Sequence, residues 1–184
     1  MRSKLFIIAA IVALIFACND SANTAPKNEL TMRFIKVLNI NSRTNVFERV
    51  PGETQITPLF IRSSKKGDID LTMLIAYDER VTKLAQQILN KPVTPLIFSV
   101  STMPFVNDNF APESLVFEQN GRKWSPSNHP ESNDMFPIDD DVPFGGPISD
   151  TQIHQGVILL PSYFDMSSPI EINYKTFRKM CLLK

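Results

Sequence analysis

Histidines, clustered carboxylates and cysteines are the side chains of this sequence that could do chemistry, and the histidines come first. Only two occur, His129 and His154. Histidine is a common general base because its ordinary pKa lies near neutral pH. His129 stands in a polar stretch and His154 precedes an apolar run, so we interpret both as surface residues. The motifs of serine hydrolases, zinc proteases and nucleotide-binding loops do not occur. The sequence therefore disfavours an enzyme, and we expect no catalytic residue and no cofactor.

An acidic cluster is the second candidate. Asp139, Asp140 and Asp141 are consecutive, with Asn133 and Asp134 upstream. Ca²⁺ takes roughly six to eight oxygen ligands of this kind. Consecutive carboxylates do not converge easily, however, and the spacing differs from that of the known calcium loop. We predict a solvated acidic turn and no metal site, with a weak calcium site as the alternative.

The two cysteines stand near opposite ends of the chain, at Cys18 and Cys181. Arg2 and Lys4 precede an uninterrupted apolar run of 13 residues, 5 to 17, that ends at Cys18. A positive start followed by a short apolar run is typical of a secretion signal. A membrane-spanning helix needs about 20 apolar residues, so this run is short for a permanent span.

Residues Ile15, Phe16, Ala17 and Cys18 resemble the lipobox of bacterial lipoproteins. In that motif an aliphatic residue stands three positions before the cysteine and a small residue directly before it. Phe16 is bulkier than the commonest residue at its position. The resemblance implies removal of residues 1–17 and acylation of Cys18 with fatty chains such as palmitate. Several acyl chains give stable anchoring, so we expect a lipid-anchored protein of the bacterial cell membrane or outer membrane. A plain secretion signal with an incidental cysteine is the alternative.

The mature chain has almost balanced charge. The sequence contains 19 basic and 19 acidic residues, and removal of Arg2 and Lys4 leaves 17 against 19, a net charge of −2. Nucleic-acid binding needs clustered cations, so we expect no nucleic-acid partner. Residues 18–30 are polar and have no apolar period, which predicts a flexible tether after the lipidated cysteine. With Cys18 acylated, Cys181 has no partner for a disulfide, and we expect it to be a partly buried apolar residue.

From residue 31 onward, short apolar or alternating runs separated by turn residues predict strands. The phase of the apolar pattern shifts near residue 35, which indicates a bulge or a strand covered on both faces. Asn120 and Gly121 tolerate the positive φ values of a type I′ turn and predict a tight hairpin. The expected strands are 31–40, 44–50, 55–64, 70–77, 94–102, 113–119, 122–125, 156–161 and 170–175.

Residues 78–90 interrupt the strand pattern. Their apolar residues recur at helical spacing, Asp78 can cap the start, and Pro92 lies beyond the end. We predict an amphipathic helix of about three turns that covers the core, either packed on the sheet or closing one end of the barrel. The proline-rich stretch at about 126–152 predicts a long loop with almost no regular structure. If the protein has protein partners, this loop is the first candidate for the contact.

These elements predict a mainly β protein, an antiparallel two-sheet β-sandwich over residues 31–184 with one short helix. The segments 120–124, 156–161, 164–165 and 170–174 resemble the immunoglobulin-like domains of bacterial surface lipoproteins. This resemblance concerns the fold alone. The anchor, the strand pattern and the missing catalytic motifs together predict a binding or structural module at the cell envelope, with the domain periplasmic or exposed at the cell surface. The alternative is a scaffold lipoprotein of a secretion or envelope complex, similar to small transthyretin-like lipoproteins that bind a partner through one loop. A hydrolase is the third possibility.

Overall fold

The computed structural model describes residues 32–33, 36, 54–62, 69–127, 133–139 and 141–184. Eleven strands, one α-helix and one 3-10 helix have bounds within these ranges. The elements are β1 (Thr54–Arg62), β2 (Ile69–Asp78), α3 (Glu79–Leu89), β3 (Val93–Thr102), β4 (Asp108–Phe110), the 3-10 helix η1 (Pro112–Ser114), β5 (Leu115–Gln119), β6 (Arg122–Trp124), β7 (Met135–Pro137), β8 (Gly146–Ile148), β9 (Ile153–Pro161), β10 (Ile170–Tyr174) and β11 (Phe177–Cys181).

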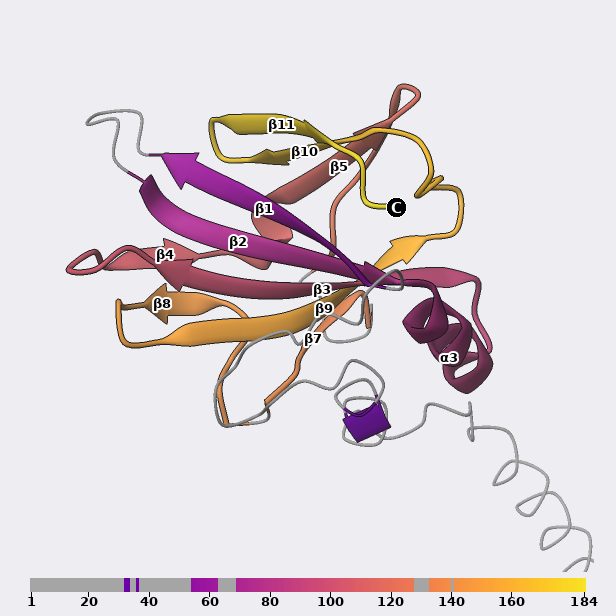
Figure 1. Cartoon of the computed structure of the whole chain (residues 1–184), viewed down its shortest axis with the longest axis horizontal. Coiled ribbons are helices and arrows are strands. Elements are labelled where there is room, and N and C mark those ends of the chain that lie inside the picture. Colours follow the sequence, from indigo (N-terminus) through magenta and orange to yellow (C-terminus); the bar gives the residue numbers. More distant parts are fainter. Residues whose placement is uncertain (1–31, 34–35, 37–53, 63–68, 128–132, 140) are drawn as a thin grey trace, which may run out of the picture.

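The strands form antiparallel sheets that pack face to face. A five-stranded sheet has the order β1-β2-β3-β9-β7, and a four-stranded sheet has the order β11-β10-β5-β6. Strands β4 and β8 form a third, two-stranded sheet. Figure 1 shows the β10 and β11 layer above the five-stranded sheet and α3 on the other side. The predicted β-sandwich with one short helix is confirmed.

The main core fills the space between the two larger sheets. It includes side chains from both, for example Leu59 and Phe98 from one sheet and Phe117 and Ile172 from the other. Burial of such side chains is worth about 1.5–3 kcal/mol each, so this interface supplies much of the stability. In β10 buried and half-buried residues alternate, as expected for a strand with one face on the core.

Helix α3 covers the other face of the five-stranded sheet, near one of its ends. Val81 and Ala85 are buried and pack with Ala76, Ile97 and Val157 of the sheet. The helix begins after the N-cap Asp78 and ends at Leu89, and the C-cap Asn90 adopts the left-handed conformation that commonly terminates helices. The predicted helix at 78–90 is therefore confirmed, and it packs on a sheet.

The hairpin of β5 and β6 confirms the predicted tight turn. Asn120 and Gly121 both have positive φ, 52° and 76°, as a type I′ turn requires. Phe117 pairs with Trp124, and their rings are 5.9 Å apart. This cross-strand aromatic pair adds stability to a hairpin that has only three residues in its second strand.

Four strands, β4, β7, β8 and β11, were not predicted from the sequence. The first three have three residues each, too few to show a period of two. β7 and β8 lie within the stretch 126–152, so the prediction of almost no regular structure there is wrong. β7 pairs with β9, and β8 pairs with β4.

The predicted strand at 31–40 is also wrong for the residues that the structure describes. Met32, Arg33 and Lys36 are helical. The shift in apolar phase places Ile35 and Leu38 three positions apart, a spacing that suits a helix as well as a bulged strand. The predicted strand at 44–50 lies outside the described residues.

The free edge of β1 faces the free edge of β11 across the side of the sandwich. Lys179 Nζ donates to the carbonyl of Pro58 at 3.1 Å, and Thr57 Oγ1 donates to the carbonyl of Leu182 at 3.4 Å. Pro58 carries no backbone N–H, and edge strands are where proline is tolerated in sheets. Residue 58 of this edge therefore offers no N–H donor, and its carbonyl is already occupied.

The long strands separate two ends of the sandwich. β3 has 10 residues, which corresponds to about 30 Å at roughly 3.3 Å per residue. Its first residue, Val93, follows α3, and its last, Thr102, leads into the loop to β4. Figure 1 shows α3 at one end and this loop at the other.

Candidate functional site

Phe105 lies at the tip of the loop between β3 and β4 and is almost fully exposed. Its side chain is 96% exposed, and Met103 beside it is 40% exposed. The tip, residues 103–107, has the sequence Met-Pro-Phe-Val-Asn and contains no charged residue. Exposed apolar side chains of this size are candidates for contact with a partner when they are grouped. We call residues 103–107 the apolar tip.

The backbone of the apolar tip is a tight turn with an unfavourable residue at its third position. Val106 N–H donates to the carbonyl of Met103 at 3.1 Å, and Phe105 has φ of 65°. A turn with Pro104 second and a positive φ third has the pattern of type II, which favours glycine or asparagine at the third position. A phenylalanine there costs about 1–2 kcal/mol in backbone strain. Strain of this kind is a reason to suspect a functional role for the side chain.

Asp150 holds the strained turn in place. Its Oδ2 accepts the N–H of Phe105 at 2.9 Å, although the two residues are 45 positions apart. Asp150 belongs to the connection between β8 and β9, where Gln152 N–H donates to the carbonyl of Ser149 at 3.0 Å. The stretch 126–152, predicted as the contact loop, therefore supplies the side chain that fixes the apolar tip.

A pocket of about 380 Å³ opens beside the strand that follows the tip. Its volume is within the range of about 300–1,000 Å³ usual for pockets that take small ligands. We call it the aromatic pocket because Phe110, Phe136 and Phe144 line it together with Met135. Its remaining lining residues are Asn109, Ala111, Pro112, Glu113, Pro137, Gly145 and Gly146.

The aromatic side chains of this lining are packed into the core, since Phe110, Phe136 and Phe144 are 1%, 5% and 5% exposed. Phe144 lies 5.4 Å from the ring of Phe110 and 6.1 Å from that of Phe98, measured between centroids. It packs directly on Gly156, where a Cβ would lie 2.1 Å from Phe144 Cγ. Only glycine leaves this space at residue 156, so the position of Phe144 depends on it.

Tyr174 fixes the chain between the tip and the pocket. Its hydroxyl accepts from Ala111 N–H at 3.1 Å and donates to the carbonyl of Asn109 at 3.3 Å. Burial raises the pKa of Tyr174 above its ordinary value, so the hydroxyl keeps the proton that it donates. Lys175 directly follows Tyr174, and Asp108 is the first residue of β4. These two residues form an ion pair at 3.4 Å.

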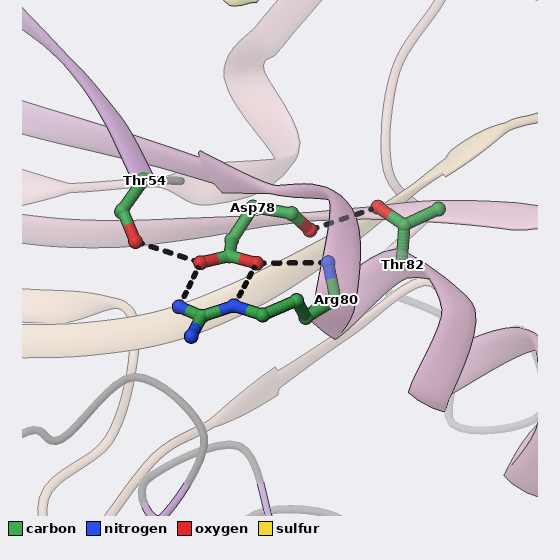
Figure 2. A network of polar contacts seen from close by, with 4 residues as sticks. All are labelled: Thr54, Asp78, Arg80 and Thr82. Carbon is green, nitrogen blue, oxygen red and sulfur yellow. Dashed lines mark hydrogen bonds and ion pairs between the residues drawn. The ribbon is translucent and has the colours of Figure 1, made fainter. Parts of the chain in front are cut away.

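A polar network around Asp78 lies at the opposite end of the sandwich. Figure 2 shows its carboxylate between Thr54 and Arg80. It accepts from Thr54 Oγ1 at 2.7 Å and from Arg80 N–H, Nε and Nη2 at 2.8, 3.0 and 2.6 Å. Thr82 adds a bond to the backbone carbonyl of Asp78 at 3.2 Å. Burial opposes ionisation of Asp78, but the hydrogen bonds outweigh it and hold the carboxyl pKa below its ordinary value.

The Asp78 network stabilises the fold and does not form a reactive site. Both carboxylate oxygens already accept hydrogen bonds, which cap α3 and join it to β1. A pocket of about 270 Å³ beside it is lined mainly by charged or polar groups, among them Lys83 and Lys184. Lys184 Nζ is 3.6 Å from a carboxylate oxygen of Glu79, so acidic and basic groups offset each other in this pocket.

His154 is buried, so its interpretation as a surface residue is wrong. It lies in β9, which begins at Ile153, three residues earlier than the predicted strand, and is only 2% exposed. Burial lowers the pKa of His154, opposed by a hydrogen bond to the backbone of Phe144. Nδ1 is buried and has no partner among the described residues. The imidazole is enclosed in the core and cannot meet a substrate in solution.

The remaining residues singled out in the sequence do not assemble into a site. Cys18, His129 and Asp140 lie outside the described residues. Asp139 Oδ1 accepts the N–H of Asp141 at 3.0 Å, which closes a local turn. Over the described ranges, no three or more His, Cys, Asp and Glu side chains are grouped to hold a metal ion. Cys181 is a buried residue of the core and only 4% exposed, more deeply buried than the partial burial predicted.

Sequence reasoning missed the apolar tip and the aromatic pocket. The available signal was the run from Met103 to Val106, which is apolar but follows the end of a strand and contains proline. The link from Asp150 to Phe105 has no local signal, because it depends on the pairing of β4 with β8.

Comparison with known proteins finds no matching family model, no similar curated protein and no similar solved structure. Across the part of the chain that the structure describes, no helix is both long and apolar enough to cross a membrane.

Proposed function

We propose that the protein is a lipoprotein of the bacterial cell envelope, anchored through Cys18, whose β-sandwich is a binding or structural module. The observation that carries the binding role is the apolar tip. Phe105 is 96% exposed in a strained turn that Asp150 fixes. An exposed and oriented aromatic side chain is suited to a partner, since aromatic residues dominate the energies of interfaces.

The anchor is supported by the sequence around Cys18. A positive start, an apolar run of 13 residues, a small residue and a cysteine occur in the order that lipidation requires. Anchoring and partner binding through the tip are compatible in geometry. The first described residue of the sandwich, Thr54, bonds to Asp78 beside α3, whereas the apolar tip follows the far end of β3.

Labelling cells with radioactive palmitate tests the anchor. The wild-type chain is expected to incorporate label and to stay with the membrane fraction. Cys18→Ser should lose both properties, because it removes the sulfur that carries the acyl chain. Cys181→Ser is the matched control, since that cysteine is buried in the core. Label retained by Cys18→Ser, or lost in Cys181→Ser, would contradict the anchor.

The role as scaffold of a secretion or envelope complex remains the second candidate. It shares the anchor and the apolar tip but requires that other components depend on the contact. Phe105→Asn in the native cells distinguishes the two roles. A scaffold loses assembly of its complex, whereas an independent module leaves all complexes intact.

A further inference from the structure

We propose that the apolar tip is a second membrane contact, in which the Phe105 ring enters the same bilayer that holds the acyl chains of Cys18. The inference rests on the lipid anchor proposed above and names a lipid surface as the partner of the tip. It arises from the shape, the backbone hydrogen bonds and the charge of the turn.

The apolar tip is a projection, which suits a fluid partner. Met103, Pro104 and Phe105 are exposed, and the ring of Phe105 is exposed almost completely. A folded protein would need a matching pocket to receive such a projection. Acyl chains close around an apolar side chain of any shape, so a bilayer needs no pocket. Contact with a membrane is one established use of grouped, exposed apolar side chains.

The backbone of the turn is prepared for an apolar medium. In such a medium a backbone N–H without an acceptor is costly, because no water is present to bond with it. Pro104 has no N–H, and Val106 N–H donates to the carbonyl of Met103 at 3.1 Å. Phe105 N–H donates to Asp150 Oδ2 at 2.9 Å. The three central residues of the tip therefore carry no free N–H donor.

Charge limits both the kind of lipid and the depth of insertion. Residues 103–107 contain no lysine or arginine, so the tip has no cation for an anionic headgroup. The Asp150 carboxylate lies directly against the backbone of Phe105, and a charge is costly inside the hydrocarbon. The partner is therefore a zwitterionic lipid surface. Only the side chains of the tip enter it, to a depth of about 5–10 Å, while Asp150 stays among the headgroups.

The chain before the sandwich is long enough for Cys18 and the tip to meet one bilayer. Thr54 lies at the α3 end, and β3 separates this end from the tip by about 30 Å. Residues 19–53 connect Cys18 to Thr54, and 35 residues can span up to about 115 Å. One ring alone attaches weakly, but acyl chains on the same molecule keep it beside the bilayer at a high effective concentration.

Tryptophan quenching by brominated lipid measures the insertion. The acylated full chain carries Phe105→Trp on a Trp124→Phe background, so that residue 105 is the single tryptophan. It is reconstituted into phosphatidylcholine vesicles with bromine on the acyl chains. We expect the emission of this reporter to be strongly quenched relative to vesicles of the same lipid without bromine, because the ring lies among the acyl chains.

Tyr163→Trp on the same background is the matched control. Tyr163 is aromatic and 45% exposed, and it follows Pro161, which pairs with Val93 at the α3 end. This reporter should remain unquenched, because the two positions lie at opposite ends of the sandwich. Thermal unfolding of both variants verifies that they are folded.

Two substitutions at Asp150 test the role of the backbone hydrogen bond. In the Phe105→Trp chain, Asp150→Ala leaves the N–H of residue 105 without its acceptor and should reduce the quenching. Asp150→Asn removes the charge but keeps an oxygen acceptor, so the quenching should be retained. Increased quenching in both variants would show that Asp150 acts only by repulsion and would refute the argument from the hydrogen bond.

Two results would overturn the proposal: an unquenched Phe105→Trp reporter on vesicles that hold the chain, or stronger quenching of the Tyr163→Trp reporter. The first would leave the tip to a protein partner, and the second would place the α3 end against the bilayer. Flotation with the vesicles and palmitate labelling report the anchor separately, so failure of the tip is distinguishable from failure of the anchor. A chain without palmitate would refute the anchor and, with it, the insertion.

Discussion

Replacement of Gly156 by alanine tests how the aromatic pocket is built. The new Cβ would lie 2.1 Å from Phe144 Cγ and 2.3 and 2.5 Å from its two Cδ atoms. Carbon atoms in contact are about 3.5–4.0 Å apart, so the ring must move by more than about 1 Å. Phe98 and Phe110 lie against Phe144, and the ring is only 5% exposed. The structure leaves little space for that movement.

The expected cost follows from two opposing effects. Overpacking of a filled core costs about 1–3 kcal/mol, and a clash with a ring held on other rings belongs at the upper end. Replacing a glycine within a strand also stabilises the fold by about 0.5–1 kcal/mol, because glycine loses more conformational freedom on folding than alanine does. The free energy of unfolding should therefore fall by about 2 kcal/mol, and the Tm by roughly 4–8 °C.

The Phe144→Ala background isolates the clash. Phe144→Ala alone should cost about 3–5 kcal/mol, because it leaves a cavity. In this background Gly156→Ala has no ring to displace and should be neutral or stabilising by about 0.5–1 kcal/mol. Gly121→Ala is the matched control, since Gly121 has φ of 76° and no atom within 4 Å of the added Cβ. Its cost should be the same in both backgrounds.

Urea unfolding monitored by the fluorescence of Trp124, the only tryptophan, gives the four free energies of the cycle. Trp124 packs on Phe117 in the core, so its emission should change on unfolding. A Gly156→Ala variant with wild-type stability would show that the Phe144 ring can move away from the new Cβ at no cost in free energy. An equal penalty in both backgrounds would show that the cost comes from the backbone and that the reasoning from the ring is wrong.

Two further predictions concern polar groups. Asp78→Ala removes the acceptor of Arg80 and the cap of α3 and should cost about 2–4 kcal/mol in urea unfolding. Lys83→Ala is the control, because it removes only an exposed ion pair with Glu79 and should cost no more than about 0.5 kcal/mol. Similar losses of stability in both variants would refute the role of the network. Burial lowers the pKa of His154, so the unfolded chain binds more protons, and stability should fall as the pH drops below the unfolded pKa of about 6.5. His154→Phe should reduce the loss of stability between pH 7.5 and 5, whereas His129→Gln should leave it unchanged, and the opposite outcome would assign the dependence to another group.

The sequence predicted the parts of the fold that have a clear period or an unambiguous turn. Helix α3 has apolar residues at helical spacing and a capping aspartate, and the β5–β6 hairpin has Asn120 and Gly121 at its turn. Strands β2, β3 and β10 are long enough to show their pattern. These elements depend on neighbouring residues, so local sequence was sufficient.

The rest depends on contacts between distant residues. β7 and β8 are held by pairing with β9 and β4, and three residues alone have no strand preference that outweighs proline and glycine. His154 is buried because it lies on the inner face of β9. The sequence did not predict this, because the apolar run that indicated the strand begins only after His154. Phe105 was overlooked because a single exposed aromatic in a loop has meaning only when its turn and its contact with Asp150 are known.

The stretch 126–152 needs a different test from deletion. Its residues form β7 and β8 and line the aromatic pocket, so removal would take partners from two sheets. Loss of binding after such a deletion would not separate a contact from a collapse of the fold. A point variant at Phe105, which is 96% exposed, keeps the sheets and addresses the contact alone.

Proline at position 58 has a consequence for how the molecule behaves among many copies of itself. An unpaired edge strand can pair with strands of other copies, and repeated pairing leads to fibrils. Here the edge strand β1 has no N–H at Pro58, and Lys179 of β11 already occupies the carbonyl of that residue. The five-stranded sheet therefore resists growth from this side, even where crowding on a surface would otherwise promote aggregation.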